Sequence, residues 1–198
     1  MPQIDLQPAA NTLAGLLEDL PEDALDRPTP CPDFRLTDLL GHVGGFALAF
    51  RAAATKDLGE LTSRPPAAGR VELEPGWRTR ITADLAAMAD AWKAPDAWDG
   101  MTRAGGIDLP GEVAGRVALD ELVVHGWDVA RASGQPYECD DASLREVDAT
   151  VRQFRAGNEG EVPGLFGPVV PVSASAPLLD QVLGLTGRDP GWSAPRER

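Results

Sequence analysis

The chain has only two histidines, and one of them stands at helical spacing from a carboxylate. Glu121 and His125 are four residues apart, so on a helix their side chains stack on one face, about 6 Å apart along the axis. Together with one imidazole from elsewhere, they make three ligands of the kind that hold a divalent metal with an open coordination position. His42 is the only remaining imidazole. The alternative is a helix-face pair that only hydrogen-bonds inside a helical bundle.

Two further carboxylates have a spacing that suits support of these imidazoles. Asp128 lies three residues after His125, and Asp38 lies four residues before His42. Either carboxylate could accept the free N–H of a ligating ring, which would fix its tautomer and raise its basicity. A salt bridge, for instance with Arg131, is the alternative for Asp128. Neither aspartate is expected to be a direct ligand.

Three protein ligands leave a coordination position for water, a thiol or a substrate. Two imidazoles and one carboxylate suit zinc first, and they also suit iron, nickel or manganese. A bound thiol would be deprotonated for attack on an electrophile, whereas a bound water would serve a hydrolase. A metal-binding scaffold or sensor without catalysis is the third possibility. The residues themselves leave all three open, and no catalytic residue beyond the metal ligands is identified.

Apolar residues at helical spacing predict an all-α fold, a four-helix bundle with additional short helices and loops. The helix that carries Glu121 is apolar around nearly its whole circumference, so we expect it to be central, where an unpaired carboxylate is costly. Segments rich in Pro and Gly predict loops over residues 57–76 and 162–171, and a loop with at most a short extended pair over 95–111. The expected helices cover residues 6–20, 36–50, 78–92, 115–133, 142–156 and 177–185.

Length and charge narrow the class of protein further. The 198 residues suit a single domain, with an ordered core at about residues 5–190. A formal charge of −13 argues against a nucleic-acid partner. The stretch 43–50 is too short to span a membrane, and the N-terminus lacks a secretory signal, so we expect a cytoplasmic protein.

Cys31 and Cys139 do not make a disulfide framework; we expect Cys31 to fill space and Cys139 not to be a nucleophile. Oligomeric state is left open.

Four stretches, taken in order, carry a resemblance to a known family. The set resembles the metal-binding, DinB-like proteins related to the N-terminal domain of mycothiol-dependent maleylpyruvate isomerase, from about residue 5 to residue 190. The stretches are Thr29-Pro-Cys-Pro-Asp-Phe34, Leu39-Leu-Gly-His42, Leu119-Asp-Glu-Leu-Val-Val-His-Gly-Trp-Asp-Val-Ala-Arg131 with Gly134-Gln-Pro136, and Leu183-Gly-Leu-Thr-Gly-Arg-Asp-Pro190.

The resemblance implies a divalent metal held by His42, Glu121 and His125. It also implies a low-molecular-weight thiol such as mycothiol as cosubstrate, a small-molecule substrate, and an activity of the thiol transferase or isomerase kind. It favours thiol chemistry over hydrolysis. Phe34 stands where the family often has Trp, and we expect this replacement to change only the local packing. The isomerase has a second, C-terminal domain that contributes to its site, and we expect this chain to differ by ending without it.

Overall fold

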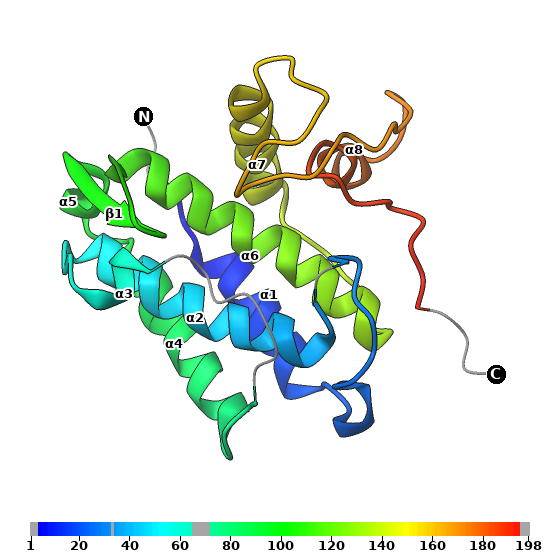
Figure 1. Ribbon diagram of the computed structural model, residues 1–198, viewed down its shortest axis with the longest axis horizontal. Coiled ribbons are helices and arrows are strands. Elements are labelled where there is room, and N and C mark those ends of the chain that lie inside the picture. The colour runs from blue at the N-terminus through cyan, green and yellow to red at the C-terminus, as the bar shows by residue number, and fades with distance from the viewer. Residues whose placement is uncertain (1–3, 33, 65–71, 195–198) are drawn as a thin grey trace.

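Four long helices form the bundle that positions the candidate site (Figure 1). They are α1 (Gln7–Glu18), α2 (Leu36–Ala54), α4 (Trp77–Ala91) and α6 (Gly111–Ser133). Both α1 and α2 pack against α4 and α6, so the order around the core is α1, α4, α2, α6. The structure is a computed structural model that describes residues 4–32, 34–64 and 72–194. The predicted all-α, DinB-like bundle is confirmed.

The core of the bundle is built from the predicted apolar stripes. Every long helix contributes side chains that are at most 1% exposed, and long unbranched or γ-branched residues dominate because they lose little rotamer freedom in a helix. Burial of such side chains is the main stabilising contribution to a bundle of this kind. These residues include Leu13 and Leu17 of α1, Leu39, Leu40 and Val43 of α2, Leu85 and Met88 of α4, and Leu119 and Leu122 of α6.

Helix α6 is longer than the sequence pattern indicates, because it begins at Gly111 rather than at Gly115. Both glycines pack closely against α5 (Pro95–Trp98). A Cβ atom at Gly115 would lie 2.6 Å from the Trp98 ring, so the glycine serves close packing and does not break the helix. At the other end, Gly134 has φ +80° and stops the helix as predicted.

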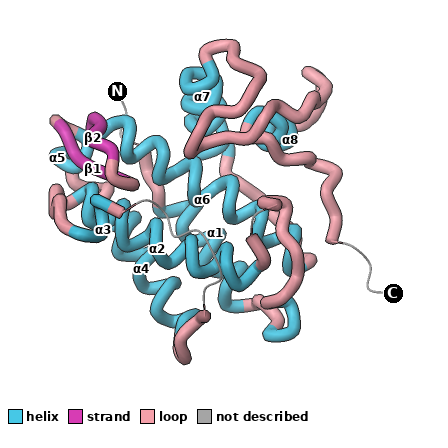
Figure 2. The backbone as a smooth tube through the Cα atoms, viewed as in Figure 1, coloured by secondary structure: helices cyan, strands magenta, loops and turns pink. Residues whose placement is uncertain are grey.

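Short elements occupy two segments that the sequence predicts to be loops. Helix α3 (Glu60–Ser63) lies within 57–76, of which residues 65–71 fall outside the described residues. Within 95–111, α5 precedes a hairpin of β1 (Met101–Ala104) and β2 (Ile107–Pro110), antiparallel with Met101 opposite Pro110 (Figure 2). The extended pair is confirmed, but the two four-residue helices and the 3₁₀ turn η1 (Glu22–Ala24) are too short to show a helical period.

A C-terminal unit, defined as residues 141–194, packs on α6 through α7 (Asp141–Arg155), and α8 (Leu178–Leu185) packs on α7. Figure 1 shows both helices on the side of α6 away from α2 and α4. The Asp140 side chain accepts hydrogen bonds from the backbone amides of Ala142 and Ser143 and so caps α7. The Arg155 guanidinium donates to the carbonyls of Asn158, Gly160, Gly167 and Leu185, which ties the unit together. None of the described helices is long and apolar enough to cross a membrane.

Candidate metal centre

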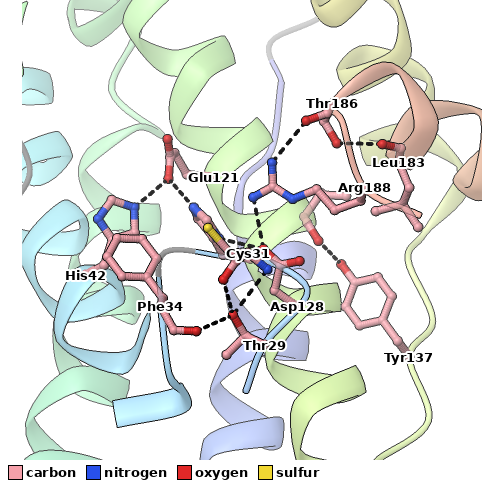
Figure 3. A network of polar contacts seen from close by, with 12 residues as sticks. Thr29, Cys31, Phe34, His42, Glu121, Asp128, Tyr137, Leu183, Thr186 and Arg188 are labelled. Atoms are coloured by element: carbon pink, nitrogen blue, oxygen red, sulfur yellow. Dashed lines mark hydrogen bonds and ion pairs between the residues drawn. The ribbon is translucent and has the colours of Figure 1, made fainter. Parts of the chain in front are cut away.

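Helices α2 and α6 bring the three predicted ligands together. Glu121 Oε2 lies 3.1 Å from His42 Nε2 and 3.1 Å from His125 Nε2. In Figure 3 the Glu121 carboxylate faces the His42 ring across the gap between the two helices. One ligand atom from each of the three side chains lies within 4.8 Å of the other two, and this is the one such His/Cys/Asp/Glu group among the described residues.

Two of the three separations among these atoms are close to those of ligands on a divalent metal. Zinc with nitrogen and oxygen ligands at about 2.0–2.1 Å in tetrahedral geometry places neighbouring ligand atoms about 3.3 Å apart. The two 3.1 Å separations are close to that value. The His42 and His125 side chains are 9% and 10% exposed, while Glu121 is 21% exposed. Two nitrogens and one oxygen therefore converge in a mostly buried position, with Glu121 the most exposed of the three side chains.

Two phenylalanines enclose the imidazoles. Phe34 stacks on His42 with ring centroids 5.5 Å apart. Phe46 meets His42 edge-on at 5.6 Å and lies nearly parallel to the His125 ring at 6.4 Å. The hydroxyl of Thr29 lies 2.8 Å from the carbonyl oxygens of Cys31 and Phe34, which folds the connector before α2 (Figure 3). These rings limit imidazole rotation and lower the local dielectric, so charge interactions at the site are strengthened.

Asp128 lies where the sequence predicts support for His125. Its Oδ2 atom accepts a hydrogen bond from His125 Nδ1 at 2.9 Å, which leaves Nε2 directed toward Glu121. The Asp128 side chain is fully buried. Arg131, the alternative partner, instead donates to the backbone carbonyl of Trp192. The geometry is that of a carboxylate holding a ligating imidazole in one tautomer.

Asp38 has a structural function at the beginning of α2. Its carboxylate accepts a hydrogen bond from the Arg35 backbone N–H at 3.1 Å, which satisfies an amide that the helix leaves free. A carboxylate at this position also interacts favourably with the helix dipole. The predicted support of His42 by Asp38 stays a prediction.

The charges at the centre are strongly coupled. Burial opposes ionisation of Glu121, but hydrogen bonds from His125 and His42 hold its pKa well below the ordinary value. Burial also disfavours the His125 cation, yet the carboxylates of Asp128 and Glu121 raise the pKa of His125 to about 9. Burial similarly opposes the charge of Asp128, while the Arg188 charge and the His125 hydrogen bond lower its pKa. The site therefore favours one positive charge among these carboxylates, which a proton or a metal ion can supply.

Two charged residues of this neighbourhood were not predicted as site residues. Arg188 Nη2 donates to Asp128 Oδ2 at 3.0 Å. Asp120 is 6% exposed, and burial, followed by the nearby Glu121 charge, raises its pKa to about 7. Arg188 belongs to one of the stretches that carry the family resemblance. A charged residue shortly after the apolar helix predicted at 177–185 was the signal that could have indicated a role for Arg188. Asp120 directly precedes the candidate ligand Glu121, but its burial depends on tertiary packing.

The two cysteines are free thiols and both are half-buried. Burial, with a further contribution from the Asp140 charge, raises the pKa of Cys139 to about 12. A thiolate there is strongly disfavoured, which agrees with the expectation for Cys139; that expectation stays a prediction. Cys31 sits in the connector that carries Phe34, and its assignment as a space-filling residue stays a prediction.

Comparison with known proteins identifies the family. Residues 6–130 match the family model described as the mycothiol maleylpyruvate isomerase N-terminal domain. The chain belongs to this family. The uncharacterized proteins MT0763 and Rv0738 of Mycobacterium tuberculosis, strains CDC 1551 and H37Rv, are each 30% identical over 189 residues, covering 92% of this chain and 94% of theirs.

Solved structures confirm the fold. The crystal structure of the mycothiol-dependent maleylpyruvate isomerase aligns with a TM-score of 0.53 at 15% identity, covering 79% of this chain and 70% of that one. A mutant of that isomerase aligns with a TM-score of 0.52 at 14% identity and the same coverage. At this identity the likeness establishes the shared bundle and carries no assignment of individual residues.

Proposed function

We propose that this protein is a metal-dependent enzyme of the thiol transferase or isomerase type. In this proposal a low-molecular-weight thiol such as mycothiol is its cosubstrate, and its substrate is a small electrophile. The observation that carries the proposal is the convergence of His42, Glu121 and His125, with Glu121 Oε2 lying 3.1 Å from Nε2 of each histidine, in a member of the mycothiol maleylpyruvate isomerase N-terminal family. These three side chains would hold the divalent metal, with zinc the first choice and iron, nickel or manganese also suited.

The chemistry follows from the donor set. A bound divalent metal supplies a Lewis acid, which lowers the pKa of a thiol or of water at the open position. Glu121 contributes one negative charge and the histidines two neutral donors, so net positive charge remains to stabilise a thiolate. Asp128 holds His125 in position at 2.9 Å, and the Phe34 and Phe46 rings restrict water around the imidazoles. With its proton released to solvent, the thiolate sulfur would bond to an electrophilic carbon as a π bond or a bond to a leaving group at that carbon breaks. In transfer the new C–S bond would persist, whereas in an isomerisation it would break again and restore the π bond.

Cobalt substitution tests the proposal directly. Thiolate ligation adds a charge-transfer band to the cobalt spectrum that water or carboxylate ligation lacks, so we expect this band when mycothiol is added to the cobalt-loaded protein. Glu121→Gln keeps the side-chain shape but removes a ligand charge, and should weaken metal binding and abolish the band together. Glu112→Gln is the matched control, because it makes the same change on α6 at an exposed residue paired with Arg116.

The alternatives predict a different spectrum. A hydrolase or a non-catalytic metal-binding module would bind cobalt through the same three residues, but its spectrum would not respond to thiols. If mycothiol, bacillithiol and glutathione all leave the cobalt spectrum unchanged, the thiol chemistry is wrong. Hydrolysis of activated esters by the loaded protein would then distinguish the hydrolase from the non-catalytic module.

A further inference from the structure

Arg188 in the C-terminal unit reaches the candidate metal centre through Asp128. Arg188 Nη2 donates to Asp128 Oδ2 at 3.0 Å, and the same oxygen accepts from His125 Nδ1 at 2.9 Å. One carboxylate oxygen therefore connects the guanidinium to a predicted metal ligand. Figure 3 shows Arg188 pointing from the end of α8 toward Asp128. The two residues are 60 positions apart and belong to different parts of the fold.

The guanidinium is itself held in place by α8. Arg188 Nη1 donates to the Thr186 carbonyl at 3.1 Å, and the Thr186 hydroxyl donates to the Leu183 carbonyl at 2.9 Å. The Arg188 side chain is 12% exposed and that of Asp128 is 0% exposed. Two buried opposite charges with fixed partners define position closely, because moving either one leaves the other uncompensated.

Arg188 and Asp128 do not form the strongest ion pair that these two side chains can make. Their geometry suits orientation of His125 instead. An arginine and a carboxylate that serve only as a tether can form two parallel hydrogen bonds. Here the contact uses Oδ2 alone, and Asp128 Oδ1 and Arg188 Nε are buried with no hydrogen-bond partner among the described residues. Arg188 thus shares the oxygen that His125 uses.

We propose that Arg188 is a positioning residue of the metal centre. It holds Asp128 Oδ2 against His125 Nδ1 and so keeps His125 Nε2 directed toward Glu121. The C-terminal unit thereby completes a centre whose ligands all come from α2 and α6. The match to the family model ends at residue 130, so Arg188 lies outside the matched segment. The inference rests on the proposed metal site.

Zinc affinity, measured by competition with a chromophoric chelator, tests this role. Loss of a residue that orients a ligand typically weakens metal binding by about 10- to 100-fold, and we expect this for Asp128→Asn. Because Arg188 acts through Asp128, R188M should weaken zinc binding by about tenfold in the wild-type background. It should cause no further loss in the D128N background. R188K keeps the charge and should recover part of the affinity, and it provides a folded variant if R188M does not fold.

Arg155→Met is the matched control. Arg155 is also a buried arginine of the C-terminal unit, but its guanidinium donates only to backbone carbonyls. R155M should lower the unfolding midpoint of the unit and leave zinc affinity within about twofold of wild type.

The outcomes separate the inference from the proposed function. If the wild-type protein binds no zinc, the proposed metal site itself is wrong. If wild type binds zinc and R188M binds it equally tightly, or if R188M and D128N weaken binding additively, Arg188 has no positioning role through Asp128. Equal loss of affinity in R155M would also overturn the inference, because docking of the unit would then be the whole effect.

Discussion

At the scale of single residues, His125 is the side chain on which the candidate centre depends most. Both of its ring nitrogens have carboxylate partners, with Asp128 at 2.9 Å from Nδ1 and Glu121 at 3.1 Å from Nε2. An imidazolium satisfies both partners by donating two protons, whereas a neutral imidazole that binds a metal through Nε2 keeps only the proton on Nδ1. Proton and metal therefore compete for the same nitrogen.

This competition makes metal affinity depend on pH. Hydrogen bonds to Asp128 and Glu121, acting against burial, raise the pKa of His125 to about 9, so the metal-free site carries a proton at pH 7 that binding must displace. We expect the apparent zinc affinity to rise about tenfold per pH unit between pH 7 and pH 8.5 and to level off near pH 9. Asp128→Asn should move this plateau to lower pH. An affinity that is independent of pH over this range would contradict the role assigned to His125.

Asp120 gives a prediction on stability. Burial, with the Glu121 charge, raises its folded-state pKa to about 7, whereas an unfolded aspartate ionises at about 3.9. A raised carboxyl pKa favours the folded state only while the group is protonated, so the penalty grows from about pH 4 to pH 7 and stays constant above. Asp120→Asn should therefore stabilise the metal-free protein by about 1–3 kcal/mol at pH 8 and by much less at pH 4.5. Urea denaturation at the two pH values measures this, and equal effects at both would contradict it.

At the scale of elements, α6 positions the centre and its glycines set how closely its neighbours approach. Gly126 lies under the Tyr137 ring, where an added Cβ would be 3.0 Å from Cε2, and the Tyr137 hydroxyl donates to the Val123 carbonyl. Gly115 faces the Trp98 ring six residues before Glu121. We expect these close contacts, one before Glu121 and one directly after His125, to fix the rotation of α6 and with it the direction of the candidate ligands.

Gly115→Ala tests this packing. Its Cβ would lie within 2.9 Å of the rings of Trp98 and Trp92, and overpacking of this kind costs about 1–3 kcal/mol, more than the gain in helix propensity of about 1 kcal/mol. We expect net destabilisation in thermal unfolding. Gly45→Ala in α2, where no atom lies within 4 Å of the added Cβ, should stabilise by about 0.5–1 kcal/mol. If G115A is as stable as G45A, α6 is not held by this contact.

The bundle helices and the group of three candidate ligands were largely predictable from sequence. Apolar periodicity located all four bundle helices, because each buries one continuous stripe or, for α6, nearly its whole surface. With only two histidines in the chain, His42 and His125 are the sole imidazoles that a metal could use. The beginning of α6 was predicted four residues late, since glycines at 111 and 115 resemble a loop unless their packing partners are known.

At the scale of the whole molecule, the contacts that were not predicted join distant parts of the chain. Arg188 meets Asp128 across 60 residues, and Arg131 holds the Trp192 carbonyl across 61. Phe46 is an ordinary core residue by its position in the stripe, but it lies against both imidazoles. Local periodicity describes which face is buried and contains no information on which distant residue meets it.

Docking of the C-terminal unit should respond to the metal. Coupling free energies are reciprocal, so if Arg188 strengthens zinc binding, zinc must strengthen the docking of the segment that carries Arg188. We expect zinc to slow amide hydrogen exchange in residues 183–192 of the wild-type protein and to have little effect there in R188M. If zinc leaves the rate of amide hydrogen exchange in this segment unchanged in both proteins, the coupling is contradicted.

The most direct test of the central claim is the metal content of the purified protein and of a His42→Ala, His125→Ala double variant. Elemental analysis after gentle purification should give about one divalent metal per wild-type chain and none in the variant. We expect the apolar stripes of the bundle to suffice for folding, so the variant should keep its helical circular dichroism. Stoichiometric metal persisting in the folded double variant would contradict the assignment of His42, Glu121 and His125 as the metal centre.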